Sequence, residues 1–256
     1  MGLSDGSATL EGRVALVTGG TRGLGREMVT AFARAGADVV IASRKQHACD
    51  EVARAVRAAT GRRAFAHACH MGSWSDVESL VDAAYSEFGA VDVLVNNAGI
   101  APVYPSLVEV SEELFDKVIA VNLKGPFRLA ALIGARMAAG NGGSIINISS
   151  VAAIRPAPDD LPYAAAKAGL DALTAGFAQA YGPKVRVNTI MAGPFLTDIS
   201  DAWDLDAFSD RAKTYALGRG GAPDEIVGAA LYLAGDASSF VTGSVLRVDG
   251  GMAIAR

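Results

Sequence analysis

Cysteine is scarce in this chain, which has only two in 256 residues. Cys49 and Cys69 have neither the spacing of a metal site nor the density of a disulfide framework. We therefore predict two buried free thiols, no bound metal and a cytoplasmic location.

Long hydrophobic runs and an excess of one charge are also missing. No segment reaches ~18 uninterrupted apolar residues, and residues 1–13 lack the apolar core of a signal peptide. The net charge is −4, and the basic residues are scattered. We expect binding to neither nucleic acid nor membrane. What the chain does have is 51% hydrophobic residues, enough for a sizeable core.

Short β-branched runs alternate with longer helical stretches along nearly the whole chain. We expect strands at Val14–Thr18, Asp38–Ser43, Ala64–Cys69, Val91–Asn96, Ser144–Ser149, Val185–Ile190 and Ser244–Val248. We expect helices at Leu24–Arg34, Lys45–Ala59, Asp76–Phe88, Glu112–Ala139, Pro162–Tyr181 and Asp224–Leu233. The alternation predicts an α/β fold, a doubly wound seven-stranded parallel sheet of the Rossmann type with helices on both faces.

The chain shows no linker that would divide it into several domains. Residues 1–11 are polar and contain glycine, which predicts a mobile tail before a single domain at 12–256. Ser75 with Glu78 predicts a capping box for the third helix. Three irregular segments, 100–110, 151–161 and 192–215, follow predicted strands. Loops at the carboxyl ends of parallel strands build the ligand crevice, so we expect these segments to form the substrate site.

A glycine-rich turn, Thr18–Gly25, joins the first predicted strand to the first predicted helix. Glycines at 19, 23 and 25 permit a tight turn, a close backbone approach to a pyrophosphate and close helix–strand packing. The helix N-terminus adds amide donors and a partial positive charge. Many glycine-rich turns bind nothing, but the position at the first strand–helix junction favours a dinucleotide site.

The end of the second strand discriminates between NAD and NADP. A carboxylate there would accept bonds from the ribose 2′-hydroxyl and repel a 2′-phosphate. Here the strand ends Ser43-Arg44-Lys45, and Arg22 projects from the glycine-rich turn. Arginine pairs with phosphate through a planar fork of donors. We predict NADP(H) in preference to NAD(H); the competing interpretation makes Arg44 and Lys45 ordinary solvated charges.

Tyr163 and Lys167 are four residues apart in a segment rich in alanine and leucine, so they share a helix face. Lowering a tyrosine pKa of ~10 by ~3 units takes about 4 kcal/mol. An ammonium about 5 Å away supplies roughly 3 kcal/mol at an effective dielectric near 20. We therefore predict an acid/base pair in which the lysine lowers the phenol pKa, although taken alone such a pair is more often one core and one surface residue.

Several motifs in one order resemble the short-chain dehydrogenase/reductase family, of the compact single-domain type that includes 3-oxoacyl reductases and glucose dehydrogenases. The resemblance runs from about Glu11 to Met252. It is carried by the turn Thr18–Gly25, Asn96-Asn97-Ala98-Gly99, Asn122, Ser150, Tyr163-x-x-x-Lys167 and Ala192-Gly193-Pro194…Thr197.

The resemblance implies a role for each catalytic residue. Tyr163 would be the acid in carbonyl reduction and the base in alcohol oxidation, and Lys167 would hold the nicotinamide ribose. Ser150 would orient the substrate oxygen and Asn122 would anchor a relay water. The implied cofactor contacts are Gly19, Thr21, Arg22, Gly23, Leu24, Gly25, Ser43, Arg44, Met71, Asn97, Ala98, Gly99, Tyr163, Lys167, Phe195 and Thr197.

Each of these residues also has a simpler interpretation. Asn122 would then satisfy only its own helix, Ser150 would merely follow a strand, and Asn96 would tie strands together. The chain departs from the family at His70-Met71, where an acidic residue often holds the adenine amine, and at Ala192, which replaces a proline. We expect backbone groups at Met71 to frame the base and His70 to be a packed or surface residue.

The irregular segments carry apolar and aromatic residues, which predict an apolar or ring-bearing carbonyl or alcohol substrate. These residues are Tyr104, Ile154, Leu161, Phe195, Leu196, Trp203 and Phe208. Segment 198–215 is a candidate lid, and the resemblance implies a homotetramer. The predicted function is an NADP-dependent oxidoreductase for a ketone/secondary-alcohol pair. The alternatives are an NAD-dependent polyol or sugar-acid dehydrogenase and a non-catalytic dinucleotide sensor.

Overall fold

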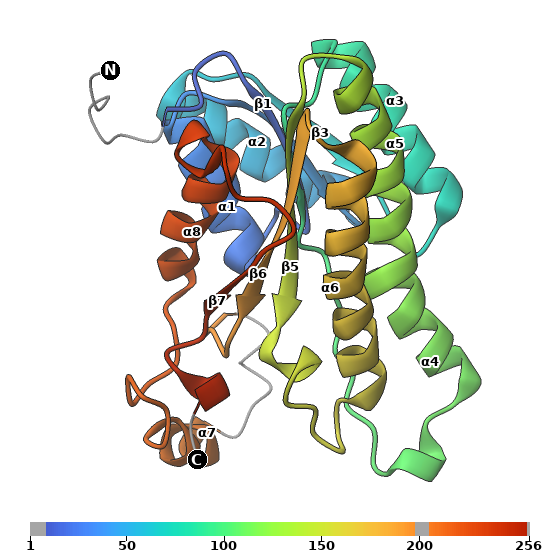
Figure 1. Cartoon of the computed structure of the whole chain (residues 1–256), viewed down its shortest axis with the longest axis vertical. Coiled ribbons are helices and arrows are strands. Elements are labelled where there is room, and N and C mark those ends of the chain that lie inside the picture. The colour runs from blue at the N-terminus through green and yellow to red at the C-terminus, as the bar shows by residue number, and fades with distance from the viewer. Residues whose placement is uncertain (1–8, 198–204, 255–256) are drawn as a thin grey trace.

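The computed structural model describes residues 9–197 and 205–254, and it contains one seven-stranded parallel sheet (Figure 1). The strand order is β3-β2-β1-β4-β5-β6-β7. The strands are β1 Val14–Thr18, β2 Asp38–Ser43, β3 Ala64–Ala68, β4 Val93–Asn96, β5 Gly143–Ser150, β6 Val185–Ala192 and β7 Val245–Val248. The predicted doubly wound α/β fold is confirmed, and the predicted strand ends differ from these by at most two residues.

Helices cover both faces of the sheet (Figure 1). They are α1 Gly23–Arg34, α2 Gln46–Thr60, α3 Trp74–Phe88, α4 Glu112–Ile119, α5 Gly125–Ala139, α6 Leu161–Tyr181, α7 Leu205–Ala212 and α8 Val227–Ala234. Helices α1, α2 and α8 pack on one face, and α3, α5 and α6 pack on the other. Successive β1 side chains serve the two cores in turn, Val17 on the first face and Leu16 on the second. Both faces are therefore apolar, which explains the continuous hydrophobic runs.

The helix predicted at Glu112–Ala139 contains an interruption. A π-helical turn, Ala120–Lys124, separates α4 from α5 and contains the fully buried Asn122. Such turns insert an extra residue into the helix and are frequent at functional sites. Among the described residues, Glu112–Ala139 is also the one helical stretch long and apolar enough to cross a membrane. Its Leu129 and Ile133 side chains are buried against the sheet, as in a core helix.

The cap of α3 differs from the prediction. The N-cap is Ser73, whose hydroxyl accepts a hydrogen bond from the Asp76 amide (3.3 Å) and donates to the Asp76 carboxylate (2.7 Å). The predicted capping box of Ser75 and Glu78 is wrong, because the helix begins earlier, at Trp74, and Glu78 pairs with Arg128 instead.

The segments predicted to be irregular or mobile contain more structure than the sequence indicated. Helix α7 lies inside the predicted irregular segment 192–215, while residues 198–204, including Trp203, lie outside the described residues. Leu10 is fully buried, and its amide donates to the Ala35 carbonyl at 2.7 Å. Within the predicted tail, residues 1–8 lie outside the described chain. The packed domain therefore begins before residue 12.

Candidate active site

The glycine-rich turn is built so closely that side chains would not fit. Gly19 has φ +66°, a conformation that favours glycine. A Cβ on Gly25 would lie 2.2 Å from the Gly19 carbonyl oxygen and 2.5 Å from Asn97 Nδ2. The Asn97 amide donates to the Thr18 carbonyl at 2.9 Å and so supports the turn from β4. The α1 N-terminus is thereby open to the close approach of a phosphate.

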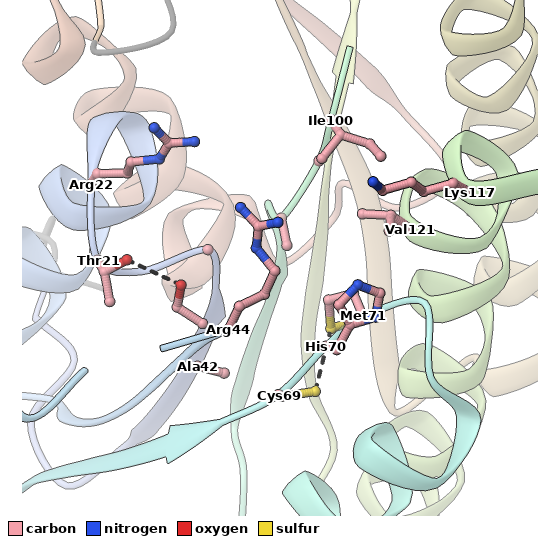
Figure 2. A pocket seen from close by; sticks show the side chains of 14 residues that line it. Thr21, Arg22, Ala42, Arg44, Cys69, His70, Met71, Ile100, Lys117 and Val121 are labelled. Carbon is pink, nitrogen blue, oxygen red and sulfur yellow. Dashed lines mark hydrogen bonds between the residues drawn. The ribbon is translucent and has the colours of Figure 1, made fainter. Parts of the chain in front are cut away.

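A pocket lies beside this turn, at the carboxyl ends of β1, β2, β3 and β4 (Figure 2). It is lined by Gly19, Thr21, Arg22, Ala42, Ser43, Arg44, Cys69, His70, Met71, Ala98, Gly99, Ile100, Lys117 and Val121. Figure 2 shows Arg22 and Arg44 on one side and His70 and Lys117 on the other. Among the residues that the structure describes, no carboxylate lines the pocket, and Arg22, Arg44 and Lys117 form no ion pair.

Most predicted cofactor residues reach this pocket or the turn. Thr21 donates to the Ser43 hydroxyl at 3.1 Å, which ties the turn to the end of β2. Thr197 lies beside the turn, since a Cβ on Gly23 would be 3.4 Å from the Thr197 Cβ. These residues would hold a dinucleotide, the turn binding its phosphates and Arg44 and His70 its adenosine end.

The side chains of three predicted cofactor residues also make contacts within the protein. Asn97 does not line the pocket, because its side chain is bonded to the glycine turn. Leu24 is partly buried against the α1 core. Phe195 is only 7% exposed, packs in that core and pairs with Gly221 through an isolated β-bridge. The Phe195 ring is therefore part of the core on that face of the sheet.

Besides His70, five further pocket residues were not predicted from the sequence: Ala42, Cys69, Ile100, Lys117 and Val121. Lys117 in α4 and Val121 in the π-helical turn are four residues apart, so they lie on the same side of this helical stretch. Their closeness in sequence to the candidate residue Asn122 could have indicated that they lie near the site. His70 was expected at a packed or surface position, and it lines the pocket beside Met71. Both cysteines are buried free thiols, as predicted, and burial raises the pKa of Cys69 to about 12.

Ser150, Tyr163 and Lys167 meet where β5 ends and α6 begins. Ser150 is the last residue of β5, and its hydroxyl hydrogen-bonds to Tyr163 in the first turn of α6. Lys167 is 3% exposed; its ammonium donates to the Ile148 carbonyl at 2.7 Å and lies 5.6 Å from the centroid of the Tyr163 ring. The structure therefore assembles the hydroxyl, phenol and ammonium that the sequence predicted.

The ionisation of the pair differs from the prediction. Burial raises the pKa of Tyr163 above its ordinary value, and the Ser150 hydrogen bond only partly opposes this. Burial also lowers the pKa of Lys167 to about 8, against the opposing effect of the Asp171 carboxylate. The predicted lowering of the phenol pKa is wrong for the protein by itself. The reason is that the Lys167 ammonium bonds to Ile148, while removal of the phenol from water disfavours the phenolate.

Asn122 links the π turn to the loop after β4. Its Oδ1 accepts from the Ile100 amide (3.1 Å), and its Nδ2 donates to the carbonyls of Ile100 and Val118 (both 2.9 Å). A Cβ on Gly99 would lie 2.8 Å from Asn122 Oδ1 and 3.7 Å from Lys167 Nζ. Asn122 and Lys167 thus both lie next to the position that a side chain on residue 99 would occupy. The interpretation that Asn122 serves only its own helix is too narrow.

Asn96 has the structural role expected of it. Its Nδ2 donates to Asn147 Oδ1 at 2.9 Å, and Asn147 donates in turn to Thr174 Oγ1 at 2.8 Å. This buried chain ties β4 to β5 and β5 to α6, and so it fixes the strand ends that carry the site.

The candidate substrate residues divide into two groups. Ile154, Leu161 and Leu196 are 51%, 40% and 44% exposed; they lie after β5, at the start of α6 and after β6. Phe208, in contrast, is buried in a small cluster of its own with Ala212 and Tyr215. These apolar side chains are therefore exposed in segments that follow β5 and β6, whereas the aromatic residue of α7 packs internally.

Comparison with known proteins places this geometry in a family. Residues 19–253 match the family model described as Enoyl-(Acyl carrier protein) reductase. The chain is 37% identical to the 3-oxoacyl-[acyl-carrier-protein] reductase FabG of Chlamydia trachomatis, covering 96% of this chain and 100% of that protein. It is 36% identical to the D-threitol dehydrogenase of Mycolicibacterium smegmatis, covering 96% and 94%.

A solved structure agrees with these sequence relatives. The gluconate 5-dehydrogenase of Burkholderia cenocepacia, in complex with NADP and tartrate, matches with a TM-score of 0.92 at 36% identity and covers 98% of both chains. Three observations support the same family: the match to the family model, the parallel sheet and the assembled group of Ser150, Tyr163 and Lys167. The chain therefore belongs to the short-chain dehydrogenase/reductase family, NAD(P)-dependent oxidoreductases that act on CH–OH and C=O groups.

Proposed function

We propose that this protein is an NADP-dependent oxidoreductase that interconverts a ketone and a secondary alcohol, with Tyr163 as the acid/base. The observation that carries the NADP preference is the pocket lined by Arg22 and Arg44 and, among the described parts of the chain, by no carboxylate. Two guanidinium groups suit a ribose 2′-phosphate, and the missing carboxylate removes the usual partner of a free 2′-hydroxyl.

NADPH, when bound, supplies the hydride for carbonyl reduction. The Ser150 hydroxyl positions the carbonyl oxygen, and Tyr163 donates its proton to that oxygen. The raised pKa of Tyr163 keeps the phenol protonated, the state that reduction requires. In the oxidative direction Tyr163 must lose its proton, and the Lys167 ammonium favours that form. Asn122 fixes the loop at Ile100 and, in this proposal, anchors the relay water through its backbone.

The relatives support a carbonyl/alcohol substrate, but they act on compounds with different carbon skeletons. Their names refer to 3-oxoacyl groups, D-threitol and gluconate, and the gluconate 5-dehydrogenase was solved with NADP. The exposed apolar residues Ile154, Leu161 and Leu196 favour an apolar or ring-bearing substrate here. An NAD-dependent polyol or sugar-acid dehydrogenase is the second candidate, supported by the D-threitol dehydrogenase likeness.

Cofactor choice is tested with Arg44→Ala. A charge-assisted bidentate pair contributes about 1.5–3 kcal/mol, so we expect KM for NADPH to rise about 10- to 100-fold and KM for NADH to change little. The matched control is Lys45→Ala, since Lys45 does not line the pocket. Equal NADPH affinity in the wild type and in Arg44→Ala would favour the NAD-dependent alternative.

Measurement of carbonyl reduction distinguishes an enzyme from a non-catalytic dinucleotide sensor. We expect the wild type with NADPH to reduce at least one member of a panel containing a 3-oxoacyl thioester, a keto sugar acid and a cyclic ketone. Tyr163→Phe should retain NADPH binding and lose reduction of the same ketone. Binding of NADPH by the wild type with no turnover of any carbonyl compound would support the sensor.

We further propose a cytoplasmic homotetramer. The free thiols Cys49 and Cys69 suit a reducing compartment. Val245 and Leu246 leave the β7 edge of the sheet apolar and exposed, and Phe127 is 39% exposed on α5. Such surfaces suit contacts between copies of the chain.

A further inference from the structure

Tyr104 makes two hydrogen bonds that join separate segments of the crevice. Its hydroxyl donates to the Pro158 carbonyl at 2.8 Å and accepts from the Leu161 amide at 3.0 Å. Tyr104 lies in the loop after β4, whereas Pro158 lies between β5 and α6 and Leu161 is the first residue of α6. One side chain thus bridges the two loops that flank the catalytic tyrosine.

The position of the second bond has a direct consequence for Tyr163. Leu161 is the first residue of α6, and amides in the first turn of a helix have no partner within the helix. Tyr104 supplies that partner two residues before Tyr163. The other flank of the same loop is tied by Arg155, whose Nη1 donates to the Met252 carbonyl at 2.7 Å. The loop is therefore held from both sides, and Tyr104 is the tie nearer to the phenol.

Tyr104 was expected to offer its aromatic ring to the substrate. The Tyr104 hydroxyl has a single proton, which it donates in the hydrogen bond to the Pro158 carbonyl. It therefore cannot also donate a hydrogen bond to a carbonyl substrate. Its oxygen also accepts the Leu161 amide. Both hydrogen bonds are to backbone groups, so Tyr104 stabilises the backbone at Pro158 and Leu161.

We propose that Tyr104 is a positioning residue that clamps the loop at 151–161 and the first turn of α6, and thereby fixes the place of Tyr163 relative to the substrate carbonyl. The proposal rests on the proposed function. Proton transfer needs the phenol within hydrogen-bond reach of the reacting oxygen, and small displacements of a catalytic group cost much of its rate. Release of the clamp should therefore slow the chemistry without removing the cofactor pocket.

Tyr104→Phe removes both hydrogen bonds and keeps the ring. The matched control is Tyr181→Phe, because the Tyr181 hydroxyl also donates to a backbone carbonyl, that of Ala131 at 3.0 Å, at the far end of the same helix. Amide hydrogen exchange over residues 157–165 is measured for the wild type and both variants. We expect exchange to be at least about 5-fold faster in Tyr104→Phe and unchanged in Tyr181→Phe.

Kinetics then show whether the clamp acts on catalysis. With NADPH and ethyl 3-oxobutanoate, a small 3-oxo ester, we expect kcat/KM of Tyr104→Phe to fall about 10-fold, with the NADPH Kd within about 2-fold of the wild type. Tyr181→Phe should retain the wild-type kcat and KM.

Two results would overturn the proposal. One is unchanged exchange at residues 157–165 in Tyr104→Phe. The other is faster exchange with kcat and KM unaltered, which would make Tyr104 a stabilising residue only. Lack of wild-type turnover on this ester and on every panel ketone would instead refute the proposed function, and the exchange result would still decide whether the clamp exists.

Discussion

Burial governs the ionisation of both members of the Tyr163–Lys167 pair. The phenol and the ammonium are each removed from water, so each is shifted toward its neutral form. The hydrogen bond to the Ile148 carbonyl and the charge of the Asp171 carboxylate partly compensate the ammonium for its loss of hydration. A buried lysine with a pKa of about 8 is therefore poised to change charge just above neutral pH.

The lowered pKa of Lys167 predicts how stability depends on pH. Between about 8 and 10.5, the folded protein binds fewer protons at Lys167 than the unfolded chain, so the free energy of unfolding rises with pH in that window. From pH 7.5 to 9.5 we expect the wild type to gain about 2 kcal/mol relative to Lys167→Met. Urea denaturation at the two pH values measures this. A difference between the two proteins that does not change with pH would show that Lys167 has an ordinary pKa.

Helix α3 illustrates how a cap is chosen between neighbouring serines. Ser73 and Ser75 both precede acidic residues three positions on, Asp76 and Glu78. The structure starts the helix at Trp74, so only Ser73 occupies the N-cap and only Asp76 the third helical position. Arg128 on α5 holds Glu78 and withdraws it from a capping role.

This cap predicts unequal effects of two similar substitutions. Ser73→Ala should lower the free energy of unfolding by about 1 kcal/mol, because the Asp76 amide loses its acceptor. Ser75→Ala should change it by less than about 0.5 kcal/mol. Thermal and urea denaturation provide the comparison. Equal losses would show that the two hydroxyls, 3.2 Å apart, act together.

The whole molecule leaves one end of its sheet apolar. Strand β7 pairs only with β6 among the described strands, and Val245 and Leu246 are 44% and 37% exposed on it. Phe240, nearby in the chain, is fully exposed. An apolar strand with one unpaired edge can contact another copy of the chain.

Assembly through β7 predicts the effect of a charge on that strand. Leu246→Lys should convert the proposed tetramer into smaller species, because an interface would have to bury an unpaired ammonium. Val108→Lys is the control, since Val108 is 94% exposed on the loop after β4. Size-exclusion chromatography with light scattering reports the masses. A wild-type monomer, or a tetramer retained in Leu246→Lys, would argue against this interface.

The amino-acid sequence by itself determined the order of the elements and the position of the chemistry. Alternating apolar runs and helical stretches specify a parallel sheet, and local spacing places Tyr163 and Lys167 on one helix face and the glycines at the first turn. Such patterns depend on residues close together in the chain, so they can be recognised in the sequence itself. Asn96 and the two arginines were identified for the same reason.

Only the tertiary structure decided which distant groups share a surface and how far they are removed from water. It brought Lys117 and His70 to the cofactor pocket, turned Phe195 into the core and raised the pKa of Tyr163. It also joined Tyr104 to Pro158 across the crevice. These outcomes depend on packing between segments far apart in the chain, and desolvation follows from that packing, so no local pattern encodes them.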